Sequence, residues 1–375
     1  MARDVAGAGI LLAVLGQPQR MAELAAGEWD LMLAQARSGA LVPHLAFQAD
    51  DCGLDGRLPE KVRQHFAGAR AVAADQDRTI RWEINRIARA LGGLGVPVVL
   101  LKGAAYVATG LAMARGRLVS DVDIMVPRSA LDRAEATLVR HGWEPMKLEP
   151  YDQRYYRTWM HELPPLRHRE RLTVIDVHHT ILPPSSRLKP DGEALLRAAL
   201  PLERPPLHVL APADMLLHCA AHLFHDGEIA DSLRDLVDLH GLLCHFGTDE
   251  TFWRALLPRA RALGLMRPLY YALRYTTRLL ETPVPAEVLA AARAGAPAGP
   301  ARALMDRLAP RALVPDHPER PDAAKRRAAF LLYVRSHWLR MPPHLLVAHL
   351  GRKAIMRLSG RHAADDATDA AAEAR

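Results

Sequence analysis

The stretch Arg117-Leu-Val-Ser-Asp-Val-Asp-Ile-Met-Val126 decides the fold class, because it places two carboxylates inside an apolar run. This run predicts a strand over residues 120–126, on which Asp121 and Asp123 point to the same face. Neighbouring carboxylates repel, and a pair that lies against a core needs a counter-charge, for which Mg²⁺ or Mn²⁺ is the natural choice. A pair on a solvated edge strand would need no metal, so the metal hypothesis depends on further residues.

Two more apolar runs predict further strands. Residues 96–101 form a continuous run of β-branched residues and leucines, typical of a buried strand, and Lys102-Gly103 follow it. Residues 172–178 form another, in which β-branched residues flank Asp176. If this strand lies beside residues 120–126, three carboxylates converge. Such a set can hold the two metal ions that promote in-line displacement at phosphorus.

Helical patterns surround the strands, which predicts an α+β fold with a small mixed sheet between N-terminal and C-terminal helical regions. One helix is expected over residues 60–73, and another, capped by Asp75 or Asp77, up to about Leu91. Residues 145–171 are expected to hold an additional strand. The predicted divisions are an N-terminal helical region at 1–80, the α/β core at 81–185, a helical domain at 186–290, a linker with basic helices at 291–360, and a disordered tail at 361–375.

Composition and charge narrow the class of protein. The chain has 375 residues, with 49 Lys and Arg against 42 Asp and Glu, so its net charge is +7. This mild excess suits phosphate handling and argues against a large nucleic-acid partner. Three scattered cysteines exclude a disulfide scaffold, and the apolar run at residues 5–16 is too short to span a bilayer. A cytoplasmic protein without a membrane span is therefore expected.

The helical part of the chain carries a second group of candidate residues. His222, His225-Asp226 and a later Asp235 or Asp238 follow the order typical of HD-type metal phosphohydrolases, although the intervals are short. An HD-type phosphohydrolase is therefore one alternative function. The other interpretation is that these groups line a cleft or pair with one another.

Further side chains are candidates for contacts around the site. His178 shares a strand face with Asp176 and can orient that carboxylate or contact a substrate. Arg234 lies four residues before Asp238, so the two can form an intrahelical ion pair or support the site. Residues 151–171 interleave Tyr and Trp with Arg, and such side chains can stack bases and bind phosphates or simply cover a sheet edge.

Three strings of residues carry a family resemblance: Pro97-Val-Val-Leu-Leu-Lys-Gly-Ala-Ala105, the stretch 117–126 quoted above, and Ile175-Asp-Val-His-His179. Together they give an LKG turn, an Arg shortly before S-D-x-D, and a later apolar-D-x-H. This pattern resembles the uncharacterised nucleotidyltransferase family, which belongs to the DNA polymerase β-type nucleotidyltransferase superfamily. The resemblance is strongest over residues 80–180 and extends through the flanking helices from about 25 to 280.

The resemblance implies a short mixed sheet with helices packed on it. It also implies Mg²⁺- or Mn²⁺-dependent transfer of a nucleoside monophosphate from a nucleoside triphosphate to an acceptor. The metal-binding and catalytic carboxylates of the family match Asp121, Asp123 and Asp176. Gly103 matches the family's turn glycine, which lets phosphates approach the backbone, and the residues expected to bind the nucleotide are Lys102, Gly103, Arg117 and Ser120.

One departure from the superfamily pattern concerns this turn. The superfamily usually has Gly-Ser there, whereas this chain has Lys102-Gly103-Ala104, and Asp121 lies eighteen residues after the glycine. Lys102 or Arg117 would then contact the triphosphate in place of the serine. The acceptor can be a small hydroxylated molecule, a peptide or a protein. A non-catalytic module that binds a nucleotide or a partner on the same fold is the alternative to an enzyme.

Overall fold

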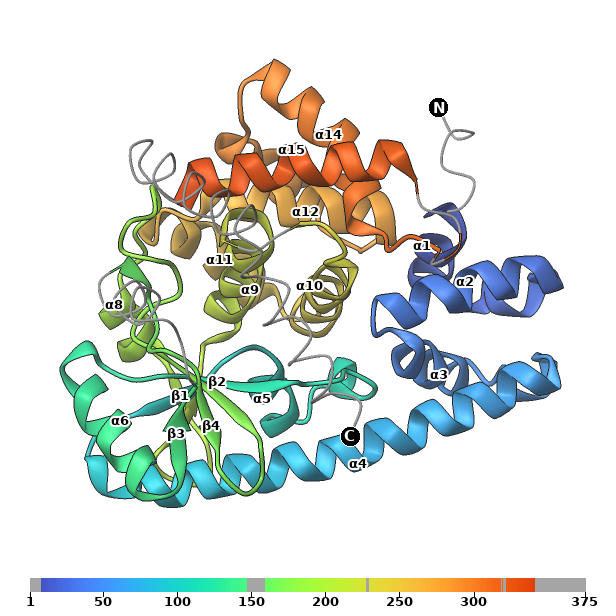
Figure 1. The fold of residues 1–375 in the computed structure, drawn as a ribbon. Coiled ribbons are helices and arrows are strands. Elements are labelled where there is room, and N and C mark those ends of the chain that lie inside the picture. Colours follow the sequence, from blue (N-terminus) through green and yellow to red (C-terminus); the bar gives the residue numbers. More distant parts are fainter. Residues whose placement is uncertain (1–7, 147–158, 227–228, 318, 320–321, 341–375) are drawn as a thin grey trace, which may run out of the picture.

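A seven-stranded mixed sheet forms the core of the computed structural model, which describes residues 8–146, 159–226, 229–317, 319 and 322–340 (Figure 1). The strand order is β3-β4-β5-β2-β1-β7-β6. Strand β2 is parallel to β5 and antiparallel to β1, so the expected mixed sheet and α+β class are confirmed. The strands are β1 (Val98–Leu100), β2 (Asp121–Met125), β3 (Trp143–Pro145), β4 (Leu166–His168), β5 (Val174–His178), β6 (Leu200–Pro201) and β7 (Leu207–Val209).

The three strands predicted from apolar runs lie in the middle of the sheet. Every residue of β1 is fully buried, as its continuous apolar sequence requires. The segment 145–171 contains β4, while residues 147–158 lie outside the described part of the chain. Strands β6 and β7 were not expected, because two or three residues are too few to show a periodic pattern.

The long helix α4 (Glu60–Leu91) runs along one side of the molecule, past both the N-terminal helices and the sheet region (Figure 1). It packs against α3 (Val42–Asp51) near its beginning, and against α5 (Lys102–Ala108) and α6 (Leu131–Arg140) of the core. A stripe of buried isoleucines and leucine on its second half faces the core. Helix α4 thereby ties the N-terminal region to the sheet.

The helix start expected at Asp75 or Asp77 is wrong, because α4 continues through both positions. Neither carboxylate caps a helix. Asp75 pairs with Arg78 at 2.9 Å and Asp77 with Arg81 at 2.8 Å, as partners three or four residues apart on one helix do. The helix therefore crosses the division placed between residues 80 and 81.

The N-terminal helices have contacts on two sides. Helix α2 (Ala26–Ser38) is joined to α3 by a short turn, and α1 (Ala8–Gly16) packs against α12 (Met266–Leu280). At that contact a Cβ on Gly16 would lie 3.0 Å from the Leu280 carbonyl oxygen. Because α3 also packs on α4, the turn between α2 and α3 has a defined position beside the core.

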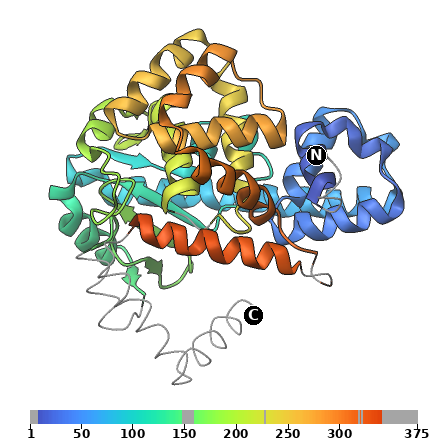
Figure 2. The same ribbon diagram turned by 90° about the horizontal axis from the view of Figure 1, so that it is seen from above.

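The C-terminal half is a layer of helices above the sheet, and α15 crosses one face of the molecule (Figures 1 and 2). No helix in the described ranges is both long and apolar enough to cross a membrane. Residues 341–375, which include the predicted disordered tail, lie outside those ranges. The helices are α8 (Gly192–Ala198), α9 (Pro212–Ala221), η6 (His222–Asp226), α10 (Leu233–Phe246), α11 (Glu250–Ala262), α12, α13 (Ala286–Ala292), η7 (Arg293–Gly295), α14 (Gly299–Leu313) and α15 (Ala323–Arg340).

Part of the segment expected as a linker is helical. Residues 291–295 complete α13 and form η7. Gly295 lies so close to the carbonyl of Met266 that a Cβ would overlap it. This close approach packs the segment against α12 instead of leaving it extended between two units.

Candidate active site

Strands β2 and β5 bring the three predicted carboxylates to one face of the sheet. In their parallel register Asp123 lies opposite Asp176, and Asp121 lies opposite Val174. Because side chains alternate along a strand, Asp121, Asp123 and Asp176 share a face. The alternate β2 residue Ile124 is fully buried on the other face, which fixes the orientation of the strand.

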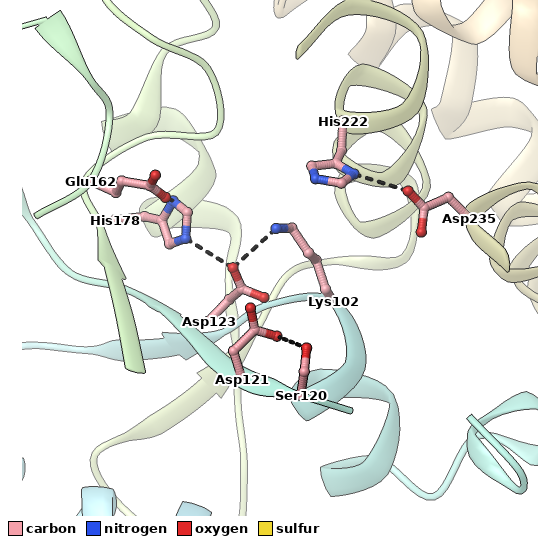
Figure 3. Close-up of polar contacts among 8 residues, drawn as sticks. All are labelled: Lys102, Ser120, Asp121, Asp123, Glu162, His178, His222 and Asp235. Atoms are coloured by element: carbon pink, nitrogen blue, oxygen red, sulfur yellow. Dashed lines mark hydrogen bonds and ion pairs between the residues drawn. The ribbon is translucent and has the colours of Figure 1, made fainter. Parts of the chain in front are cut away.

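Asp123 is a buried carboxylate held between a lysine and a histidine (Figure 3). Lys102 Nζ and His178 Nε2 each lie 3.0 Å from Asp123 Oδ1. Burial alone would raise the pKa of Asp123, but Lys102 and His178 hold that pKa well below its usual range. Burial likewise disfavours the charge on Lys102, yet the attraction of Asp123 is stronger and raises the pKa of the lysine. The structure therefore keeps Asp123 ionised and fixed in position.

Asp176 has the opposite electrostatic environment. Its Oδ1 is buried and has no hydrogen-bond partner among the described residues. Burial, followed by the negative charges of Glu162 and Asp123, raises the pKa of Asp176 to about 7. A carboxylate oxygen without a partner, beside other carboxylates, fits the all-oxygen ligand set that Mg²⁺ and Mn²⁺ prefer.

Two residues that the sequence analysis missed surround His178. Glu162 Oε2 lies 3.3 Å from His178 Nδ1, and the ring centroids of His161 and His178 are 5.1 Å apart. These three residues are the one group of His, Cys, Asp and Glu in the described ranges whose ligand atoms all lie within 4.8 Å of one another. Because both nitrogens of His178 already face carboxylates, this group holds Asp123 in place. A short antiparallel bridge between Glu162 and His178 positions the Glu162 side chain, and no sequence motif predicts this bridge.

A pocket of about 400 Å³ borders β2 and is lined by three parts of the chain. This volume lies within the range of small-molecule sites, which is about 300–1,000 Å³. All four residues expected to bind nucleotide line it, whereas Asp176, His178 and Asp238 do not. The lining consists of Ser38, Gly39 and Ala40 from the N-terminal region, Lys102, Gly103, Arg117, Val119, Ser120, Asp121 and Asp123 from the core, and His222, Asp231, Ser232, Arg234 and Asp235 from the helical part.

Backbone strain gathers around this pocket. Ala40, Lys102 and Asp231 have φ values of 53°, 43° and 59°, in the left-handed region that L-residues rarely adopt. All three line the pocket. Strain of this kind persists where the surrounding structure enforces it, and it is concentrated at ligand-binding sites. Lys102 lies two residues after the end of β1, and from there its side chain reaches Asp123.

Arg117 supports the glycine turn and joins the core to α10. Its Nε donates to Asp238 Oδ2 at 2.7 Å, and the two side chains are 9% and 6% exposed. A Cβ on Gly103 would overlap the Arg117 guanidinium and would lie 2.9 Å from Val119 Cγ2. A larger residue at this position would therefore displace the Arg117 side chain from its contact with Asp238.

The ion pair expected between Arg234 and Asp238 is replaced by two other contacts. Asp238 pairs with Arg117, as described above, and Arg234 Nη1 donates to the Leu118 carbonyl at 3.4 Å. Arg234 therefore reaches from α10 toward the residues that precede β2, and its guanidinium lines the pocket.

His222 and Asp235 form a pair across the site from the carboxylates (Figure 3). His222 Nδ1 lies 3.2 Å from Asp235 Oδ2. Burial would raise the pKa of Asp235, but the contact with His222 outweighs it and lowers the pKa to about 2. An ionised carboxylate at Nδ1 favours a proton on that nitrogen and fixes the orientation of the ring.

The described residues do not assemble an HD-type metal centre. His225 Nε2 bonds to the Ser186 hydroxyl at 2.7 Å, whereas His222 pairs with Asp235. In the described part of the chain these histidines do not form a compact set of metal ligands, and the side chain of Asp226 lies outside it.

Residues 25–281, more than half of the chain, match the model of a family described as uncharacterised nucleotidyltransferase. Comparisons with curated proteins and with solved structures give no significant match. The matched segment includes the three carboxylates and every residue that lines the pocket. The chain therefore belongs to the uncharacterised nucleotidyltransferase family, as its sequence motifs predict.

Proposed function

We propose that this protein is a magnesium- or manganese-dependent nucleotidyltransferase that moves a nucleoside monophosphate from a nucleoside triphosphate to an acceptor hydroxyl. The observation that carries the proposal is the register of β2 and β5, which sets Asp176 opposite Asp123 with Asp121 on the same face. The adjoining pocket also contains the cations Lys102 and Arg234. Metal-binding carboxylates beside cations that neutralise phosphate are the groups that this chemistry needs.

Asp121, Asp123 and Asp176 would hold the divalent ions, which when bound activate the attacking hydroxyl and neutralise the leaving pyrophosphate. The residues around them have positioning roles. Lys102 keeps Asp123 ionised, and the Ser120 hydroxyl donates to Asp121 Oδ1 at 3.1 Å, so this serine orients a carboxylate. Asp176 accepts the proton of the acceptor hydroxyl.

The triphosphate takes its cationic contacts from two elements. The Lys102 ammonium has further N–H donors besides the one directed at Asp123, and its side chain borders the pocket. Arg234 approaches from α10. Arg117 is occupied by Asp238 and by its contact with Gly103, so its part is to hold the pocket wall. Lys102 and Arg234 thus compensate for the serine absent from the turn.

Labelled nucleotides test the proposal. The protein is incubated with Mg²⁺ and each ribonucleoside triphosphate, labelled at the α-phosphate, together with pools of hydroxylated metabolites, peptides or proteins. We expect pyrophosphate release and label on an acceptor from one pool. Tight nucleotide binding without release would favour the non-catalytic module, and neither binding nor release would contradict both functions.

Replacing His222 by Gln is expected to lower kcat/KM by about ten- to hundredfold, the size of a lost charge-assisted hydrogen bond. Asp235 holds the His222 imidazole in a fixed orientation across the pocket from Lys102. The variant therefore loses the hydrogen bond that this ring would make to a molecule bound in the pocket. Asp235→Asn should have a similar effect, since the ring then loses its orientation. The assay is pyrophosphate release, with His245→Gln, an exposed histidine on α10, as the matched control. Equal rates for His222→Gln and His245→Gln would remove this pair from the reaction.

A further inference from the structure

A second cavity, of about 690 Å³, lies between η6, α12, η7, α14 and α15. It shares no lining residue with the pocket of the proposed active site. Helix η6 contributes to both, because His222 lines the first pocket while Phe224 and His225 line the second. Most of the second lining is apolar, with Met305 and Leu332 among its buried members.

The charged groups that line this cavity are three arginines, Arg187, Arg267 and Arg335, and no Asp or Glu lines it in the described part of the chain. Arg335 Nη1 donates to the Phe224 carbonyl at 3.0 Å, and its guanidinium lies 5.5 Å from the centroid of the Tyr271 ring. Both of these partners are uncharged. Burial lowers the pKa of Arg335, and no carboxylate among the described residues reverses that shift.

Two other arginines of the same helical layer show how such a side chain is neutralised. Arg274 of α12 donates to Asp306 through Nε and Nη2 at 2.8 and 2.6 Å. Arg259 of α11 binds Asp214 in the same two-pronged way, at 2.6 and 2.8 Å. No described carboxylate lines the cavity beside Arg187, Arg267 and Arg335, and positive charge without such a partner favours an anion.

Neither half of the C-terminal segment 341–375 by itself carries both large apolar side chains and acidic groups. Residues 341–360 contain apolar side chains but also Arg352, Lys353 and Arg357, and no acidic residue. Residues 361–375 contain acidic residues but no large apolar side chain. An occupant that satisfies both the apolar walls and the arginines must carry an apolar chain and a negative head.

We propose that this cavity is a binding site for a single-chain anionic amphiphile, an acyl or alkyl chain with a carboxylate or phosphate head group. The chain packs against Met305, Leu308 and Leu332, and the head group accepts hydrogen bonds from Arg335. Leu304 lines the cavity and is 54% exposed, so its apolar side chain is accessible to the ligand. This site is additional to nucleotidyl transfer and does not depend on it.

Calorimetric titration of the full chain with dodecyl phosphate, below its micelle concentration, tests the site. We expect one ligand per chain, with dodecanol and inorganic phosphate each binding at least about tenfold more weakly, because each lacks one half of the ligand. Arg335→Gln should weaken binding by about tenfold or more. Arg327→Gln, exposed on the same helix and outside the cavity, is the matched control and should bind like the wild type.

Melting curves establish that each variant is folded. If Arg335→Gln does not fold, Leu304→Trp, which fills the opening with a larger side chain, takes its place and should also weaken binding. No binding of dodecyl phosphate by the wild type, or equal affinities of the folded cavity variants and Arg327→Gln, would overturn the proposal.

Vesicles of phosphatidylglycerol distinguish a free ligand from a lipid in a bilayer. We expect the protein to remain in the supernatant when such vesicles are sedimented. Sedimentation that Arg335→Gln abolishes would show that the anion belongs to a membrane surface, and the assignment to a free amphiphile would then be wrong.

Discussion

Replacing Asp176 by Asn is expected to lower pyrophosphate release by about two to four orders of magnitude, and to raise the melting temperature of the metal-free protein. The first effect follows because Asn keeps the size of Asp but loses the charge that holds a metal ion and accepts a proton. Nucleotide affinity should fall less than turnover, since Asp121 and Asp123 remain and face the pocket. A residue with a merely structural role would not combine lost activity with gained stability.

The gain in stability follows from the raised pKa of Asp176. The folded protein raises this pKa from 3.8 to about 7, so between these values the folded state binds more protons than the unfolded state. The stability of the wild type therefore falls as the pH rises through this window, and the whole cost is present above pH 7. The two pKa values set an upper limit of about 4 kcal/mol, which partial hydration of the site reduces. Asn is neutral at every pH, so the Asp176→Asn variant does not lose this stability.

Thermal unfolding in excess chelator at pH 5 and pH 8 measures this difference. We expect Asp176→Asn to melt about 2–5 °C above the wild type at pH 8, and by a smaller margin at pH 5. Asp132→Asn, an exposed carboxylate on α6, is the control and should show no such dependence. Wild-type turnover in Asp176→Asn would show that Asp176 is not the third catalytic carboxylate.

Replacing Asp123 by Asn should reduce turnover by at least about three orders of magnitude and should destabilise the fold. Asp123 is the shared partner of Lys102 and His178, so the change leaves the partly buried Lys102 ammonium without its carboxylate and removes one of the two carboxylates beside the buried His178. Breaking one buried ion pair in this way typically costs about 3–5 kcal/mol. The two Asp→Asn variants therefore shift the melting temperature in opposite directions, although both remove a carboxylate from the same face of the sheet.

A second substitution separates the loss of stability from the loss of activity. In Lys102→Met/Asp123→Asn the lysine charge is removed as well, so part of the lost melting temperature should return while turnover stays absent. Melting curves and pyrophosphate release are measured on the wild type, both single variants and the double variant. Recovery of turnover in the double variant would show that Asp123 acts only by neutralising Lys102.

The central strands and the carboxylate face could be predicted from the sequence because strand geometry determines both. Continuous apolar runs indicate β1, β2 and β5, and alternation along a strand places Asp121 and Asp123 on one face. The local pattern does not determine that β2 and β5 pair directly, with Asp123 opposite Asp176. This pairing depends on the tertiary fold.

The rest of the site depends on contacts between distant segments, which leave no periodic signal. The turn between α2 and α3 brings Ala40 to the pocket from far upstream, and Glu162 reaches His178 through a bridge outside the named strands. Arg117 pairs with Asp238, 121 residues away, although a partner for Asp238 was available on its own helix. Spacing along the helix favours a pair between Asp238 and Arg234. Asp238 pairs with Arg117 instead, because the Arg117 side chain is buried between the core and the helix.

The proposed activity requires that Asp121, Asp123 and Asp176 form a single site for divalent metal. Titration of Mn²⁺ followed by electron paramagnetic resonance, with a non-hydrolysable nucleoside triphosphate present, tests it without knowledge of the acceptor. We expect saturable loss of the free Mn²⁺ signal with the wild type and with Asp132→Asn, weaker Mn²⁺ binding with Asp176→Asn, and no Mn²⁺ binding with folded Asp123→Asn. Equal Mn²⁺ binding by the wild type and Asp123→Asn would contradict it.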